Sequence, residues 1–135
     1  MITSTLPQPV PPRHRRSVLF VVLLALVTYL ALRPANPQVV VEGWDKVNHL
    51  LAFLVLAAVG VAAMPAPAPS AERWTAVWLL AYGAWIEWAQ TLTATRQAEF
   101  LDWVADAVGI LIGLALARWL GARRRRRANR ANEPA

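Results

Sequence analysis

Residues 101–120 read LDWVADAVGILIGLALARWL, and this segment combines the apolar length of a membrane helix with two acidic side chains near its start. A helix needs about 20 predominantly apolar residues to cross a bilayer. At about 100° per residue, Asp102, Asp106, Gly109 and Gly113 share one stripe of that helix. The two glycines form a GxxxG motif, which lets helices approach closely. The segment therefore predicts a membrane helix whose acidic, glycine-containing face packs inside a helical bundle.

Three further apolar runs precede this segment, at residues 17–32, 47–64 and 74–92. The first is short for a bilayer, but Arg16 and Arg33 flank it and can extend their charged ends to the membrane surface. The chain of 135 residues is 57% hydrophobic and only 16% charged, with a mean hydropathy of +0.38, whereas soluble domains are about 25% charged. It has no cysteine, which excludes disulfides and thiolate metal sites. We expect an all-α polytopic membrane protein, built as a four-transmembrane-helix bundle.

The distribution of positive charge predicts the orientation of the four helices. If both termini are cytoplasmic, 11 of the 14 lysines and arginines lie on the inner side, as the positive-inside rule requires. The first helix is expected to stay uncleaved, because Arg33-Pro34 stands where a signal peptide needs small residues. The predicted organisation is a disordered Pro/Arg-rich N-terminus (1–16), a membrane domain (17–120) and a basic cytoplasmic tail (121–135). The arginines of the tail are expected to contact anionic lipid, and no nucleic acid partner is predicted.

Polar and ionisable residues gather at the predicted outer ends of three of the helices. Such side chains are costly inside a membrane and are usually paired or functional. Glu87 and Asp106 each lie about 7.5 Å from the outer end of their run, at a rise of about 1.5 Å per residue. The predicted polar cluster consists of Asp45, Lys46, His49, Glu87, Gln90, Arg96, Asp102 and Asp106.

The run at residues 74–92 separates its side chains onto two faces. Gly83, Glu87 and Gln90 follow the spacing i, i+4 and i+7 and form one stripe. The nearly opposite face carries Trp74, Trp78, Trp85 and Trp88. We expect the tryptophans to face lipid, with the outermost in the interfacial regions, although they could instead dock another protein. The small and polar stripe is then expected to face the other helices, with Gly83 as a packing contact.

In these positions the sequence resembles the VanZ-like family of small bacterial membrane proteins, over roughly residues 45–120. The family has three motifs, Asp-Lys-x-x-His, Glu-x-x-Gln, and an Arg followed by an Asp and by Asn-x-x-Gly-x-x-x-Gly. They are matched in order by Asp45, Lys46 and His49, by Glu87 and Gln90, and by Arg96, Asp102, Gly109 and Gly113. Asp106 stands where the family usually has Asn, which adds an ionisable group.

This resemblance implies a multi-pass protein of the bacterial cytoplasmic (inner) membrane. It also implies a link to the cell envelope and to antibiotic resistance, because the family takes its name from a member linked to low-level resistance to the glycopeptide teicoplanin. The resemblance supplies no reaction.

The preferred interpretation of the polar cluster is a site at the outer leaflet that binds or modifies a lipid or a lipid-linked envelope precursor. Lys46 and Arg96 would bind a phosphate or carboxylate head group. Glu87 and His49 would form an acid–base pair, with Asp106 as the third candidate catalytic residue. The candidate ligand-binding residues are Asp45, Lys46, Gln90, Arg96 and Asp102. Whether the site catalyses a reaction or only binds is left open.

Three alternatives remain. The cluster could be a structural ion-pair network between helices. Proton or ion transport needs a polar route through the membrane, whereas the inner halves of two runs, such as 54–63 and 108–117, carry no charge. A divalent metal would suit mixed histidine and carboxylate ligands, although no compact motif such as HExxH is present. Its ligands would be His49, Glu87, Asp102 and Asp106. No metal or other cofactor is predicted, and the oligomeric state stays open.

Overall fold

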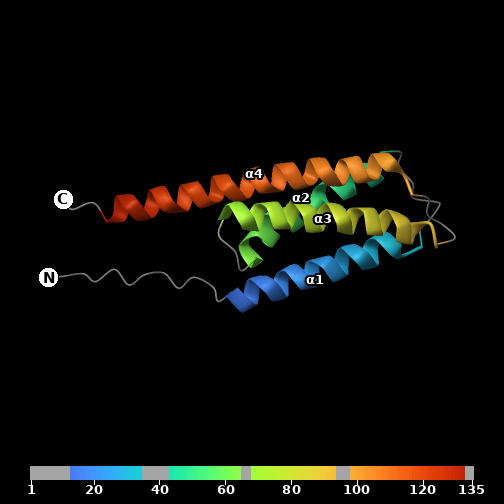
Figure 1. The fold of residues 1–135 in the computed structure, drawn as a ribbon, viewed down its shortest axis with the longest axis horizontal. Coiled ribbons are helices and arrows are strands. Elements are labelled where there is room, and N and C mark those ends of the chain that lie inside the picture. The colour runs from blue at the N-terminus through green and yellow to red at the C-terminus, as the bar shows by residue number, and fades with distance from the viewer. Residues whose placement is uncertain (1–12, 35–42, 65–67, 94–97, 133–135) are drawn as a thin grey trace.

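The computed structural model describes residues 13–34, 43–64, 68–93 and 98–132. Its helices are α1 (Arg13–Leu32), α2 (Trp44–Ala63), α3 (Ala68–Gln90) and α4 (Phe100–Ala131). Consecutive helices run in opposite directions, so that α1 begins and α4 ends on the same side of the molecule (Figure 1). These ranges contain no strand, and the prediction of an all-α fold is confirmed.

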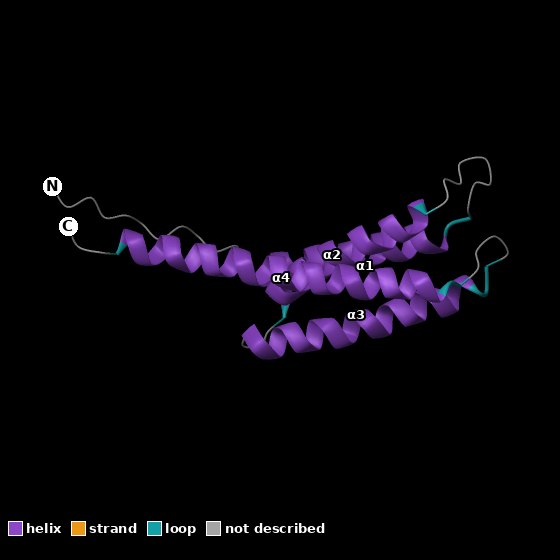
Figure 2. Ribbon diagram, turned by 90° about the horizontal axis from the view of Figure 1, so that it is seen from above, coloured by secondary structure: helices purple, strands orange, loops and turns teal. Residues whose placement is uncertain are grey.

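Three segments are long and apolar enough to cross a membrane: His14–Leu32 within α1, Trp44–Ala63 (α2) and Phe100–Ala131 (α4). The chain therefore has the features of a membrane protein. α3 has 23 residues but is not among these three segments, and it carries Glu72, Arg73 and Glu87. It nevertheless lies alongside the other helices in the same bundle (Figure 2).

Two helices extend beyond the apolar runs from which they were predicted. α1 begins at Arg13, so residues 13–16 are helical where the sequence suggested disorder, while residues 1–12 lie outside the described part of the chain. α4 continues through the basic tail as far as Ala131. The physical reason is that arginine and alanine are good helix formers, and that a residue added to an existing helix gains a hydrogen bond without a new nucleation step. Apolar length therefore marks the part of these helices that is apolar enough to cross a membrane, and not the ends of the helices.

α2 and α4 approach each other backbone to backbone. At Gly109 and Gly113, α4 lies against the backbone carbonyl groups of Leu50 and Leu54 of α2, and a Cβ atom at either glycine would overlap the carbonyl oxygen. Both glycines are buried. The GxxxG segment thus brings the backbone of α4 into close contact with the backbone of α2.

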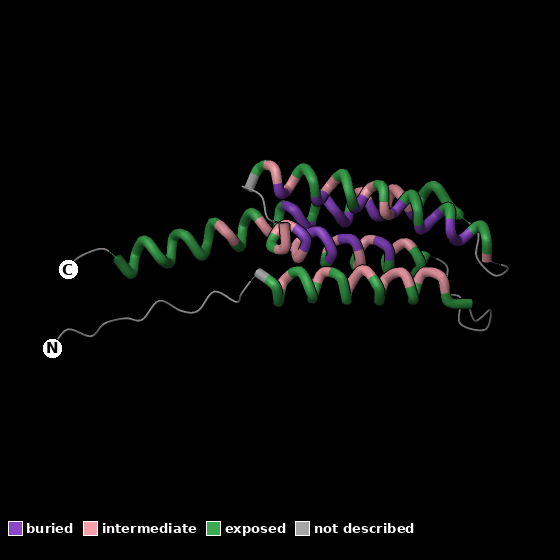
Figure 3. The backbone as a smooth tube through the Cα atoms, turned by 60° about the horizontal axis from the view of Figure 1, so that its bottom comes forward, coloured by how far each residue is buried: buried purple, intermediate pink, exposed green. Residues whose placement is uncertain are grey.

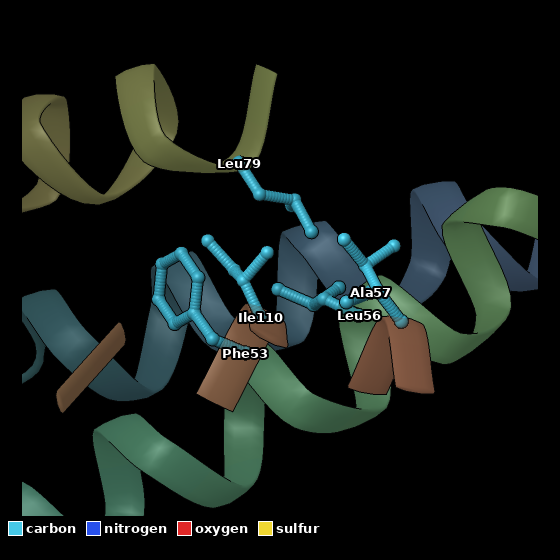
Figure 4. Close-up of a cluster of buried hydrophobic side chains, with 6 residues drawn as sticks. Phe53, Leu56, Ala57, Leu79 and Ile110 are labelled. Atoms are coloured by element: carbon cyan, nitrogen blue, oxygen red, sulfur yellow. The ribbon is translucent and has the colours of Figure 1, made fainter. Parts of the chain in front are cut away.

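The apolar core lies between α2, α3 and α4. Phe53, Leu56 and Ala57 of α2 meet Leu79 of α3 and Ile110 of α4 (Figure 4). Buried residues lie on the facing sides of these three helices, whereas α1 and the last turns of α4 are half-buried or exposed (Figure 3). The described side chains of α1 contribute only a partly buried face to the bundle.

The tryptophans of α3 point away from this core. Their exposed fractions are 57% for Trp74, 63% for Trp78, 43% for Trp85 and 58% for Trp88. The opposite face of the same helix contributes the fully buried side chains of Leu79 and Ile86. The division of α3 into an aromatic outer face and a packed inner face therefore follows its sequence pattern.

Polar contacts attach α1 to α3. The hydroxyl of Tyr82 donates to the backbone carbonyl of Leu24 at 3.0 Å and lies 2.8 Å from the hydroxyl of Thr28. Gln90 Nε2 donates to the backbone carbonyl of Ala31 at 3.2 Å. Because the accepting carbonyl groups belong to Leu24 and Ala31, these bonds hold the second half of α1 against α3.

Candidate functional site

His49 of α2, Glu87 of α3 and Asp106 of α4 lie together near the end of the bundle where α2 and α4 begin and α3 ends (Figure 1). Nδ1 of His49 is 2.9 Å from Oδ1 of Asp106 and 3.9 Å from Oε1 of Glu87. The exposed fractions are 7% for His49, 8% for Glu87 and 0% for Asp106. We call these three residues the His49 cluster. The structure thus brings together the three residues that the sequence analysis named as candidate catalytic groups.

Two carboxylate oxygens of the His49 cluster are buried without a hydrogen-bond partner, Oε1 of Glu87 and Oδ2 of Asp106. The other oxygen of Glu87, Oε2, accepts a hydrogen bond of 3.0 Å from the backbone N–H of Glu99. A carboxylate oxygen left without a partner in a buried position costs free energy. The cluster therefore has an unmet requirement for a proton or a cation.

Gly83 explains how Asp106 fits between the helices. A Cβ atom at Gly83 of α3 would lie 2.6 Å from Oδ2 of Asp106 and 3.3 Å from the ring of Phe53. The missing side chain at this position leaves the space that the carboxylate occupies. The small residue and the acidic residue are thus parts of one contact between α3 and α4.

Lys46 forms ion pairs with two acidic residues at the start of α4. Its Nζ lies 2.7 Å from Oε2 of Glu99 and 3.4 Å from Oδ1 of Asp102. Asp102 is 2% exposed, so Lys46 neutralises a buried carboxylate rather than presenting a free positive charge. These contacts tie the first turn of α2 to the start of α4.

The other predicted ligand-binding residues are Gln90, Asp45 and Arg96. Gln90 is buried and bonds the end of α1 instead of joining the His49 cluster. Asp45 is exposed in the first turn of α2 and borders a cavity. Arg96 lies outside the described residues.

A cavity of about 270 Å³ opens beside the His49 cluster. Its walls come from α1, α2 and α3, and from Arg33 just after α1. The apolar lining residues are Val27, Leu30, Ala31, Ala52, Phe53 and Ile86. The polar lining residues are Arg33, Asp45, Asn48 and His49. The cavity therefore joins an apolar region to a polar region that contains a histidine and an arginine.

Sequence analysis did not assign Arg33 or Glu99 to this site. Arg33 was interpreted only as a flanking charge of the first apolar run, yet it lines the cavity. Glu99 binds Lys46 through its side chain and Glu87 through its backbone N–H. Both residues stand just outside a helix, where helical periodicity gives no information about the direction of a side chain. The sequence feature that could have identified them is their position beside the predicted outer ends of helices, where the polar cluster was expected.

Comparison of the chain with models of protein families, with curated proteins and with solved structures finds no match. The resemblance to the VanZ-like family therefore rests on the three motifs alone. Because a four-helix bundle hosts many activities, the function has to be argued from the site itself.

Proposed function

We propose that this chain is a VanZ-like protein of the bacterial cytoplasmic membrane in which all four helices cross the bilayer and both termini are cytoplasmic. The length of α3, its exposed tryptophan face and its antiparallel position in the bundle support a fourth membrane-spanning helix. The arginines at the end of α4 support a cytoplasmic C-terminus and contact with anionic lipid. In this orientation the His49 cluster and the cavity face the outer leaflet.

The function that we propose is binding of a membrane amphiphile with an anionic head group, such as a phospholipid or a lipid-linked envelope precursor. The carrying observation is a single cavity that combines apolar walls with Arg33 and His49. Arginine binds phosphate and carboxylate through paired, charge-assisted hydrogen bonds. The hydrocarbon part of the ligand lies along Val27, Leu30 and Phe53, and the head group lies near Arg33.

Modification of the bound head group is the second part of the proposal. The carboxylate of Asp106 on Nδ1 of His49 fixes the tautomer of the ring, which leaves Nε2 to take a proton from a bound group. Glu87, 3.9 Å from the same ring, is placed to hold a second proton. Glycopeptide resistance of the teicoplanin type is the envelope phenotype that the VanZ-like resemblance suggests for such a site.

Lipid retained by the purified full-length chain tests the binding proposal. Native mass spectrometry of protein extracted in mild detergent should find a bound anionic amphiphile. R33Q should lower its occupancy roughly tenfold or more, because a charge-assisted hydrogen bond contributes about 1.5–3 kcal/mol. The control is R73Q, since Arg73 is exposed near the start of α3, at the opposite end of that helix from Glu87. Equal lipid occupancy in wild type, R33Q and R73Q would contradict the proposal.

A structural network is the second candidate, and the contacts of Lys46 and His49 favour it. Lys46 binds Asp102 and His49 binds Asp106, so both contacts join α2 to α4. Lys46 also binds Glu99, the residue that precedes α4. If these contacts only hold the bundle together, H49A and E87Q remove folded protein from the membrane. If the site is functional, both variants insert in normal amounts but lose the antibiotic or envelope phenotype. Quantitative immunoblots of membranes beside drug susceptibility tests distinguish the two results.

Transport is the least supported function. Within the described part of α2 and α4, the stretches 50–63 and 107–117 carry no charged side chain. The charges of the candidate site therefore have no continuation toward the other end of these helices.

A further inference from the structure

The His49 cluster offers three ligand atoms from three different helices for one ion. One atom each from His49, Glu87 and Asp106 lies within 4.8 Å of the other two. A histidine nitrogen with two carboxylate oxygens is a ligand set that divalent transition metals accept. We propose that the His49 cluster binds one divalent transition metal ion of the Zn²⁺ type, which replaces the proton that Nδ1 of His49 carries in the acid–base arrangement.

The distances suit such an ion. Two ligand atoms at about 2.0–2.1 Å from a tetrahedral Zn²⁺ lie about 3.3 Å apart. The observed separations of His49 Nδ1 from Asp106 Oδ1 and from Glu87 Oε1 are 2.9 and 3.9 Å, which lie on either side of that value. The ligand atoms of Asp106 and Glu87 lie within 4.8 Å of each other, and the fourth position of a tetrahedral ion remains for water or a ligand.

The unpartnered oxygens are the independent reason to expect a cation here. Oε1 of Glu87 and Oδ2 of Asp106 are buried without a hydrogen-bond partner, and their residues are 8% and 0% exposed. No described lysine or arginine pairs with Glu87 or Asp106. The nearby Lys46 pairs instead with Glu99 and Asp102. A divalent ion supplies the missing positive charge and a bond to Glu87 Oε1.

A second group, Asp45, His49 and Asp102, also has its ligand atoms within 4.8 Å of one another. It is the weaker choice for two reasons. Asp45 is exposed, and Lys46 already neutralises Asp102 at 3.4 Å. D102N therefore tests this second group, whereas Glu72 supplies a matched control for Glu87, since it is an acidic residue of the same helix that pairs with Arg118.

Cobalt is a suitable probe, because Co²⁺ in a protein site of tetrahedral type absorbs visible light far more strongly than hydrated Co²⁺. The full-length chain in detergent, first treated with a chelator, should develop this absorption up to one equivalent of Co²⁺ and lose it when Zn²⁺ is added. E87Q should bind Co²⁺ at least tenfold more weakly, whereas E72Q should bind like wild type. R33Q should also bind Co²⁺ normally, so that the metal proposal and the lipid proposal fail or hold separately.

Three results would overturn the metal site. The first is folded wild-type protein that gives no absorption above that of Co²⁺ in buffer, which would mean that protons rather than a metal balance the two carboxylates. The second is loss of binding in D102N with retention in E87Q, which would place the ion in the other group. The third is equal affinity in wild type, E87Q and D102N. The wild-type titration decides the question even where E87Q does not fold.

Discussion

Gly109 and Gly113 control the contact between α2 and α4 through the absence of a side chain. Each lies against a backbone carbonyl of α2, at Leu50 or Leu54, and a backbone carbonyl cannot rotate away as a side chain can. Gly121, on the same helix, has nothing within 4 Å of an added Cβ. The helix thus contains glycines of two kinds, which differ in packing and not in backbone conformation.

We predict that G109A destabilises the protein whereas G121A does not. Overpacking of a tight contact costs about 1–3 kcal/mol, while alanine in an exposed helical position gains up to about 1 kcal/mol over glycine. Thermal or SDS-induced unfolding in detergent, followed by circular dichroism, measures both variants. Equal stability of G109A and wild type would show that the two backbones can separate without cost.

Individual residues also show how far the sequence predicted the site. His49, Glu87 and Asp106 were placed together because helical spacing fixes the face of each residue and the alternating direction of the helices fixes its depth. Lys46 remains a predicted head-group ligand, and its flexible side chain also contacts Glu99, a residue just before α4 whose position helical periodicity could not predict. The shared position of His49, Glu87 and Asp106 was therefore predictable, whereas the hydrogen-bond and ion-pair partners of Lys46 and Gln90 were not.

At the scale of one element, α3 differs from its neighbours because its exposed face is built from tryptophan. Tryptophan has an apolar ring and a polar N–H, so it favours the boundary between lipid and water. The packed face of α3 carries Thr75, Gly83 and Glu87 among apolar residues. Average apolarity therefore underestimates how well this helix suits a membrane, since its polar groups face the other helices.

We predict that α3 crosses the bilayer, with its start in the cytoplasm. The chain has no cysteine, so single cysteines can be introduced without background. T91C, just after α3, should react with a membrane-impermeant maleimide in intact cells, or in spheroplasts where an outer membrane is present. S70C, in the first turn of α3, should react only after the cytoplasmic membrane is permeabilised. Labelling of both positions from the same side would show that α3 does not cross.

The whole molecule has two chemically different ends. Acidic and basic side chains mix at the end that holds the His49 cluster, whereas exposed arginines dominate the other end. Arg123 lies over the ring of Trp119 at 4.5 Å, and α4, about 48 Å long at 32 residues, extends well beyond the other helices (Figure 1). The fold class and this polarity of charge followed from the sequence. The continuation of α4 as a helix did not, because a charged segment can be either helical or disordered.

The pairing of α2 with α4 also sets an order of events during translation. His49 and Asp106 are 57 positions apart, which at about 5–20 residues per second corresponds to about 3–11 seconds of synthesis. During that delay α2 has been synthesised, but Asp106, Gly109 and Gly113, which pack against it, have not yet been added by the ribosome. A nascent chain stopped before α4 therefore presents an incomplete α2 to the insertion machinery, and quality-control proteases have a defined interval in which to recognise it.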